Sequence, residues 1–351
     1  MLQLGLMRKL WESKVSRRKL LGGAAATSAA LPVLHELIPH QGLHGGTSAA
    51  HAAVEHHDVA HGGSGHLGAI GRVDHARNGF DPQAILRDFD EGVVRGGVRE
   101  WEIVAEDREI EVAPGVKYAA WTYNGRVPGP TLRAREGERL RIRFVNGSKH
   151  PHTMHFHGIH RDLSDGIPGI GPGNVGPGES NVYEFDATPF GLHLYHCHST
   201  PLAEHIAKGL YGAFIIEPKA GRAPADELVM VMNGFDTNFD RSNEVYAVNT
   251  VAFAYMDEPI QVKRGELVRI YLVNALEFDP VNSFHIHANF FDYYPTGTRL
   301  EPRDFTDTVI QGQGERGILE LRFPYTGKYM FHAHVSEFAD LGWMGFFEVT
   351  D

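Results

Sequence analysis

Cys197 is the only cysteine in this 351-residue chain, and it stands between His196 and His198. The residues just before it, 191–195, are mostly bulky and apolar and predict a buried strand. Successive side chains of a strand point to opposite faces, so the two histidines would leave on one face and the cysteine on the other. Thiolates and imidazoles both bind transition metals, so one short strand could serve two metal sites. Taken alone, the tripeptide also fits a buried free cysteine beside two surface histidines.

The chain carries three more His-x-His pairs, and all four pairs fall at corresponding positions of an internal repeat. Residues 130–146 match 259–274 in type and spacing, and a His-x-His pair follows each segment. A second pair closes each copy, before similar final strands at 212–217 and 345–349. Structural histidines rarely account for four matched pairs, and eight imidazoles favour copper, which binds nitrogen ligands strongly. The eight residues are His155, His157, His196, His198, His285, His287, His332 and His334.

The elements that must position these pairs are short strands. From about residue 99 onward, apolar segments of strand length alternate with turns rich in Gly and Pro. No segment has the periodicity of a long amphipathic helix. The sequence therefore predicts an all-β fold with two homologous β-sandwich domains, at residues 99–220 and 225–351.

Composition narrows the class of protein. Charged residues make up 22% and hydrophobic residues 42%, which is typical of a soluble globular protein. The net charge of -11 argues against a nucleic acid partner, because no concentration of positive charge is present to meet phosphates. A single cysteine excludes an internal disulfide.

The N-terminal region predicts export. Arg17 and Arg18 precede an alanine-rich, weakly apolar run, and residues 1–34 resemble a twin-arginine (Tat) signal peptide. The run is too short for a membrane span, so we expect a periplasmic or extracellular protein with no integral membrane span. Residues 35–98 begin with many histidines spaced by Gly, Ala and Ser, and predict a largely disordered linker. That stretch fits either a copper-gathering tail or a solvated linker of biased composition.

The repeat resembles the multicopper oxidases, in which four His-x-His pairs hold a trinuclear copper cluster. Residues 124–132, with the sequence NGRVPGPTL, and residues 155–159, with the sequence HFHGI, also resemble motifs of that family. The resemblance covers both domains, from about Glu100 to the C-terminus. With two domains, the chain is similar to the small laccase-like enzymes, which implies two cupredoxin-like Greek-key sandwiches.

The resemblance also implies a type 1 (blue) copper in the first domain. His152, Cys197 and His205 match the family's three ligands, and Leu210 stands at the axial position. Leucine cannot coordinate, so the copper would be three-coordinate unless a nearby methionine reaches it. The second domain lacks these ligands and has non-ligands or poor ligands at the matching positions. Those residues are Asn282, Ala333 and, as the counterpart of His205, Phe338.

The implied activity couples one-electron oxidation of a reductant at the blue copper to four-electron reduction of dioxygen to water at the trinuclear cluster. Cys197 would pass the electrons, and the chain would bind four copper ions. Asp165 matches an acidic residue of the family and is a candidate proton donor, although a turn aspartate is common in a Gly/Pro-rich loop. The two-domain resemblance implies a head-to-tail homotrimer with clusters shared between subunits. Relatives oxidise phenols, Cu(I), Mn(II), bilirubin-like pigments or small nitrogen compounds.

Other functions stay open at this point. A copper-containing nitrite reductase also has two cupredoxin domains, and residues 203–213 resemble its blue-site loop. Its single catalytic copper, however, needs neither His198 nor paired histidines in the second domain. A non-enzymatic periplasmic copper-binding protein would explain the histidine-rich tail but not a cysteine between two imidazoles. A cupredoxin relic that has lost its metals is disfavoured, because only the axial ligand is missing.

Overall fold

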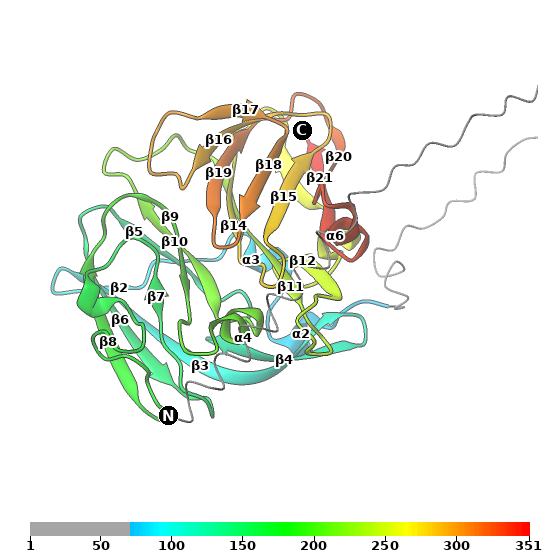
Figure 1. Cartoon of the computed structure of the whole chain (residues 1–351). Helices are drawn as coiled ribbons and strands as arrows, with labels where there is room; N and C mark the ends of the chain where they lie inside the picture. Colours follow the sequence, from blue (N-terminus) through cyan, green and yellow to red (C-terminus); the bar gives the residue numbers. More distant parts are fainter. Residues whose placement is uncertain (1–70) are drawn as a thin grey trace, which may run out of the picture. The chain divides into compact units, whose positions relative to one another are not determined.

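The structure is a computed structural model that describes residues 71–351. The predicted signal peptide, residues 1–34, and the histidine-rich stretch up to residue 70 lie outside the described residues. Within the described part, short strands are the main elements, and the longest helix has six residues. The expected all-β fold is therefore confirmed (Figure 1). No helix of this part has the length and apolarity needed to cross a bilayer.

The first sandwich consists of two mixed sheets. One has the strand order β1-β5-β10-β9-β7 and the other β2-β3-β6-β8, with β4 paired to β3. The strands of the first sheet are β1 (Phe89–Asp90), β5 (Thr131–Arg135), β10 (Tyr211–Glu217), β9 (Gly191–His196) and β7 (His155–Phe156). Those of the second are β2 (Val93–Arg95), β3 (Val98–Ala113), β6 (Arg139–Asn146), β8 (Ser180–Asp186) and β4 (Val116–Tyr123).

The second sandwich repeats this plan. One sheet has the order β12-β11-β14-β19-β16-β17 and the other β13-β21-β20-β15-β18. The strands of the first are β12 (Val245–Val248), β11 (Asp226–Phe235), β14 (Val268–Asn274), β19 (Arg316–Leu321), β16 (Phe291–Pro295) and β17 (Asp304–Thr306). Those of the second are β13 (Ile260–Lys263), β21 (Met344–Thr350), β20 (Gly327–His332), β15 (Val281–Ile286) and β18 (Thr308–Gly312). The helices are α2 (His75–Asn78), α3 (Pro82–Ile85), η2 (Asp162–Ser164), α4 (Leu202–Ala207), α5 (Ala254–Asp257) and α6 (Ser336–Asp340).

The two sandwiches pack against each other through a shared apolar core. Each has its own buried cluster, and a third cluster combines Val112, Tyr118 and Leu192 of the first with Val231 and Tyr271 of the second. Burial of this much apolar surface is the main favourable contribution to such an interface. The halves of one chain are thereby fixed relative to each other, which determines where their histidines can meet.

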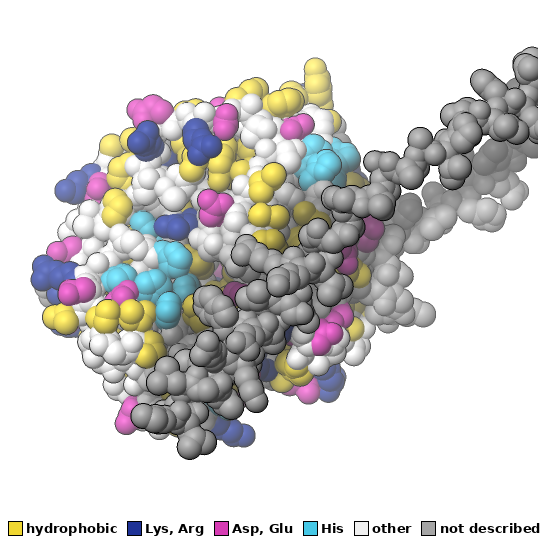
Figure 2. Space-filling view, in the orientation of Figure 1, with side chains coloured by type: hydrophobic (Ala, Val, Ile, Leu, Met, Phe, Trp, Pro, Cys, Tyr) yellow, Lys and Arg dark blue, Asp and Glu magenta, His cyan; other side chains and the backbone are white. Residues whose placement is uncertain are grey.

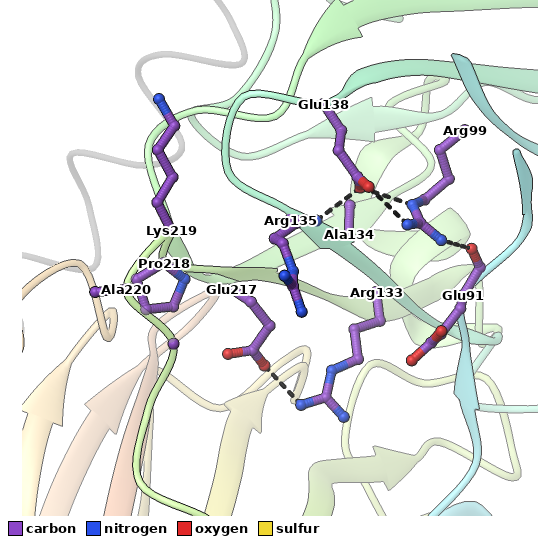
Figure 3. A pocket seen from close by; sticks show the side chains of 11 residues that line it. Glu91, Arg99, Arg133, Ala134, Arg135, Glu138, Glu217, Pro218, Lys219 and Ala220 are labelled. Carbon is purple, nitrogen blue, oxygen red and sulfur yellow. Dashed lines mark hydrogen bonds and ion pairs between the residues drawn. The ribbon is translucent and has the colours of Figure 1, made fainter. Parts of the chain in front are cut away.

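An ionic network joins the same two halves. Arg133 on β5 donates to Glu217 at 2.7 Å and to Glu227 of β11 at 2.6 Å, and Arg269 of β14 donates to Glu227 and Glu320. Figure 3 shows Arg133 and Glu217 in a polar cavity of about 720 Å³, which none of the eight paired histidines lines. Burial acts to raise the pKa of the Glu227 carboxyl, but Arg133, Tyr271 and Arg269 outweigh it and hold that pKa below its ordinary value.

Residues 71–98 correct the predicted linker. They contain α2, α3, β1 and β2, and Leu86 lies fully buried in the core of the second sandwich. The Leu86 carbonyl accepts from Val229 N, and the Pro82 carbonyl accepts from the Tyr255 hydroxyl. These segments are too short to give a recognisable period, so composition suggested disorder where tertiary contacts impose order.

Candidate metal centres

Three predicted ligands converge inside the first sandwich. The Nδ1 atoms of His152 and His205 lie 3.1 Å apart, and Cys197 Sγ lies 3.2 Å from His205 Nδ1 and 3.8 Å from His152 Nδ1. His152 follows β6, Cys197 follows β9, and His205 belongs to α4. One sulfur and two imidazole nitrogens facing a common point match the ligand set of a blue copper site.

Backbone and side-chain hydrogen bonds hold this loop cluster in place. Cys197 N donates to the Leu210 carbonyl, and Leu210 N donates to the His205 carbonyl, so the axial position is tied to both ligands. Thr153 N donates to Cys197 Sγ at 3.4 Å, and Thr153 Oγ1 accepts from His198 N. Leu210 is fully buried. The predicted axial residue is thus fixed beside the ligands without a coordinating atom of its own.

Burial sets the protonation of these ligands. It lowers the pKa of His152 to about 3 and that of His205 to about 4, so both imidazoles are neutral at pH 7 and keep a lone pair. Burial also raises the pKa of the Cys197 thiol. A bound cation reverses that effect, because it stabilises the thiolate directly. The three groups are therefore poised to bind a metal and poorly suited to remain charged without one.

A second cluster lies at the ends of β7 and β9. His155 and His196 are cross-strand partners, and the Nε2 atoms of His157 and His196 are 2.9 Å apart. His198 joins them, with its ring centroid 5.3 Å from that of His155. Burial lowers the pKa of His157 to about 3 and that of His196 to about 4. The first-domain set is therefore four neighbouring imidazoles, of which at least these two are neutral.

The second sandwich contains the matching set. His285 and His332 are cross-strand partners, and the Nε2 atoms of His287 and His332 are also 2.9 Å apart. The ring centroid of His334 lies 5.3 Å from that of His285. His287 and His334 are exposed, so this set opens to the surface. The repeat seen in the sequence is thus also a repeat in the arrangement of imidazoles.

Hydrogen bonds to the opposite ring nitrogens orient both sets. His196 Nδ1 faces the Cys197 carbonyl at 2.8 Å, and His332 Nδ1 faces the Ala333 carbonyl at 2.7 Å. His285 Nδ1 meets Thr308 Oγ1 at 2.8 Å. Such contacts fix the tautomer and direct Nε2 toward a common point, as is usual for imidazoles that bind metals.

Asp165 performs the equivalent task for His155. His155 Nδ1 hydrogen-bonds to the Asp165 backbone carbonyl at 2.9 Å, and one Asp165 carboxylate oxygen lies 2.9 Å from the same nitrogen and 3.1 Å from His160 Nε2. Gly166 makes this approach feasible, because a Cβ atom there would lie 1.8 Å from the Met154 carbonyl oxygen. The sequence indicated Asp165 but not His160, whose role depends on loop geometry. The structure thus brings Asp165 into contact with a predicted cluster ligand.

The two histidine sets do not meet within one chain. Among residues 71–351, each group of histidines close enough to share a metal belongs to one sandwich only. Figure 2 shows two separate groups of histidine side chains, one over β7 and β9 and the other beside β20. Each set alone offers half of the eight predicted cluster ligands.

A cavity of about 520 Å³ lies over the first-domain set. All four of its histidines line this cavity, together with apolar residues of α4 and the loop at 274–277 of the second sandwich. Glu277 is the one carboxylate among the lining residues, and burial raises its pKa. Its neighbours in space are far away in the chain, so no local pattern marked it.

The second sandwich keeps the outline of the blue site but fills it. Ala333 N donates to the Trp343 carbonyl and Trp343 N to the Phe338 carbonyl, as Cys197, Leu210 and His205 do in the first sandwich. Phe338 is therefore the counterpart of His205, and Trp343 that of Leu210. Asn282 and Ala333 occupy the other two positions and are fully buried. Within this sandwich, the three ligand positions hold an amide, a methyl group and an aromatic ring in place of ligands.

Comparisons with known proteins agree with this geometry. Residues 105–221 and 222–351 match two family models, each described as multicopper oxidase. A solved structure described as a multicopper oxidase is 64% identical, covers 79% of this chain and 100% of its own, and superposes with a TM-score of 0.78. The blue copper oxidase from Nitrosomonas europaea is 28% identical over 72% of this chain and 86% of its own, with a TM-score of 0.64. A copper-containing nitrite reductase of Neisseria gonorrhoeae is 30% identical over 72% of this chain and 67% of its own length.

Proposed function

Because the chain belongs to the multicopper oxidases, we propose that it couples one-electron oxidation of a small reductant to four-electron reduction of dioxygen to water, as a laccase does. The observation that carries this proposal is the duplicated histidine geometry. Both sets keep a cross-strand pair of imidazoles and an Nε2–Nε2 approach of 2.9 Å. A binding protein or a one-copper catalytic site would not require both sets.

The donor sets fit copper. Two neutral imidazoles and a thiol that converge at 3.1–3.8 Å suit a type 1 ion, and imidazole-only sets suit the remaining three. When bound, copper supplies the one-electron exchange with the reductant and the multi-electron reduction of dioxygen. We propose four copper ions per chain: one held by His152, Cys197 and His205, and three by the two histidine sets.

The chain's own residues provide the electron-transfer path and the protons. Cys197 is bonded through the backbone to His196 and His198, so a blue-site ligand and two cluster ligands are consecutive residues. Asp165 holds His155 Nδ1 and can exchange a proton there with His160. Glu277 lines the same cavity as the four histidines, and its raised pKa lets the carboxyl keep a proton closer to neutral pH. We propose Asp165 and Glu277 as the proton donors for dioxygen reduction.

We further propose that each cluster forms between two chains. The two sets are separate within one chain, and shared apolar and ionic contacts fix the sandwiches that carry them. A head-to-tail ring of three chains would place the first-domain set of one subunit against the second-domain set of the next. The open, exposed second-domain set is consistent with such an arrangement.

A copper-containing nitrite reductase is the second candidate, favoured by the 30% identity to the Neisseria gonorrhoeae enzyme. Oxygen uptake and nitrite reduction by the copper-loaded protein separate the two, with copper counted per chain. Four copper ions and oxygen uptake support the oxidase, whereas two copper ions and faster nitrite turnover would refute it.

The twin-arginine motif at Arg17 and Arg18 supports export to the periplasm or beyond, which we also propose. Replacing both arginines with lysine should keep the protein in the cytoplasm, as cell fractionation would show.

A further inference from the structure

We propose that electrons reach the blue site through the indole ring of Trp121, and that the reductant docks on the outer side of this ring, beside His150 and Lys208. The proposal rests on the proposed oxidase function and adds where the electron donor binds. It makes Trp121 a positioning and coupling residue, since it touches the predicted ligands and not the metal itself.

The ligands themselves are closed to a donor. His152 and Cys197 are 0% exposed and His205 is 2% exposed. A reductant therefore cannot stack on the edge of a ligand imidazole, and an intervening group must connect it to the site.

Trp121 is that intervening group. Its ring centroid lies 4.7 Å from that of His205 and 5.0 Å from that of His152, so it contacts both imidazoles. Trp121 N donates to the Lys208 carbonyl at 2.8 Å, which fixes β4 against the end of α4, the helix that carries His205. Electron transfer weakens steeply with distance, so a ring in contact with both imidazoles is the favourable path outward.

The outer side of the indole is covered by two groups that do reach solvent: Trp121 is 8% exposed, and His150 and Lys208 lie against its ring. The exposed His150 ring lies 4.8 Å from Trp121, and Lys208 Nζ lies 5.3 Å from the indole. The same ammonium lies 4.5 Å from the ring of Phe239 and borders a cavity of about 250 Å³. The exposed rings of His150 and Phe239 beside the Lys208 ammonium offer a small donor both stacking and polar contacts.

The second sandwich supplies an internal comparison. Tyr246 N donates to the Leu341 carbonyl as Trp121 N does to Lys208, and its ring stacks on Phe338 at 4.0 Å. An aromatic residue over this helix therefore belongs to the fold. In the first sandwich, by contrast, Trp121 lies between the imidazoles of the predicted ligands His152 and His205 and the exposed ring of His150.

The electron balance is simple. The donor loses one electron and, if it is a phenol, the hydroxyl proton to solvent; the blue-site metal gains that electron. Trp121 is neither oxidised nor reduced overall, and the Lys208 ammonium beside it opposes positive charge on the indole. The indole therefore acts as a bridge.

The test is anaerobic stopped-flow bleaching of the blue band by hydroquinone in Trp121→Leu, Trp121→Phe and His150→Ala, with Tyr246→Leu as the matched control. Trp121→Leu should slow bleaching about tenfold or more, which corresponds to about 1.4 kcal/mol of activation free energy. Trp121→Phe should stay close to wild type because it keeps a ring, and Tyr246→Leu should match wild type. His150→Ala should slow bleaching by hydroquinone, because it removes the exposed ring beside Trp121. Unchanged or faster bleaching in Trp121→Leu would overturn the proposal.

A second readout does not depend on turnover or on the Leu variant folding. Loading copper(II) should quench tryptophan fluorescence strongly in the wild type and much less in Trp121→Phe, because Trp121 contacts two ligands. Equal quenching in both proteins would overturn the geometry. Because bleaching needs no dioxygen, a blue protein that bleaches normally but reduces no oxygen would count against the oxidase function, not against the route.

Discussion

Mixing two inactive variants tests the shared cluster most directly. His155→Ala damages the first-domain set and leaves the second intact, whereas His332→Ala does the reverse. If each cluster takes one set from each of two chains, a mixed ring contains some contacts between an intact first-domain set and an intact second-domain set. Each parent protein should be inactive in oxygen reduction.

The expected recovery follows from the separation of the two sets. In a ring assembled at random from equal amounts, each cluster has a chance of about one half of receiving an intact first-domain set and about one half for the second. About one quarter of the clusters are then complete, so the mixture should reach about one quarter of wild-type oxygen uptake per chain.

The assay needs co-expressed chains with different affinity tags, purified in sequence so that every ring contains both variants, which raises the recovery above the random value. The matched control combines His155→Ala with His157→Ala. Both changes damage the first-domain set, so no cluster can be complete and no activity should return. If folded, copper-loaded mixtures are as inactive as their parents, or if a monomer is fully active in light scattering, the shared cluster is wrong.

Three further outcomes are expected. Cys197→Ser should abolish the blue absorption band while electron paramagnetic resonance still shows copper at the cluster, and a variant that stays blue would contradict the assignment. Arg269→Met should lower the free energy of unfolding by about 3 kcal/mol, because it removes a buried guanidinium, leaves the half-buried Glu320 without its arginine and leaves Glu227 with Arg133 alone. Arg143→Met, at an exposed ion pair, should cost less than about 1 kcal/mol in the same urea titration. The folded-state pKa of Glu227 is depressed, so its stabilising contribution is present above its unfolded pKa of about 4.3. That contribution is lost as the pH falls through the folded-state pKa. Acid should therefore unfold Arg269→Met at a higher pH than wild type. Deleting residues 35–66 should leave folding and fully loaded activity unchanged but slow copper uptake at limiting copper, as timed blue-band growth would show.

The sequence predicted the parts of the site that repeat. Strand alternation and the duplicated His-x-His spacing were enough to place eight imidazoles in two sets, because those signals are local. The counterparts Asn282 and Phe338 also followed from the alignment of the two copies, and the matching backbone hydrogen bonds of Phe338 agree with it.

What the sequence did not predict depends on contacts between distant segments. Trp121 and Glu277 stand in a strand and a loop with no distinctive spacing, and only the packing of α4 and of the second sandwich brings them to the candidate metal centres. Residues 71–98 lack periodicity, and Leu86 is ordered only because the second sandwich covers it.

The absence of ligands at the blue-site position of the second sandwich has a consequence for electron supply in the proposed enzyme. Because Asn282, Ala333 and Phe338 stand at the ligand positions of the second sandwich, each proposed cluster would receive electrons from one blue site only. Every dioxygen molecule needs four electrons, so the same cysteine must conduct four times in succession before one water-forming cycle ends. The turnover rate would then depend on how quickly that one blue site is reduced again, and a slow or scarce donor would leave the cluster partly reduced. A chain with a blue site in both sandwiches would need only two electrons from each site per dioxygen molecule.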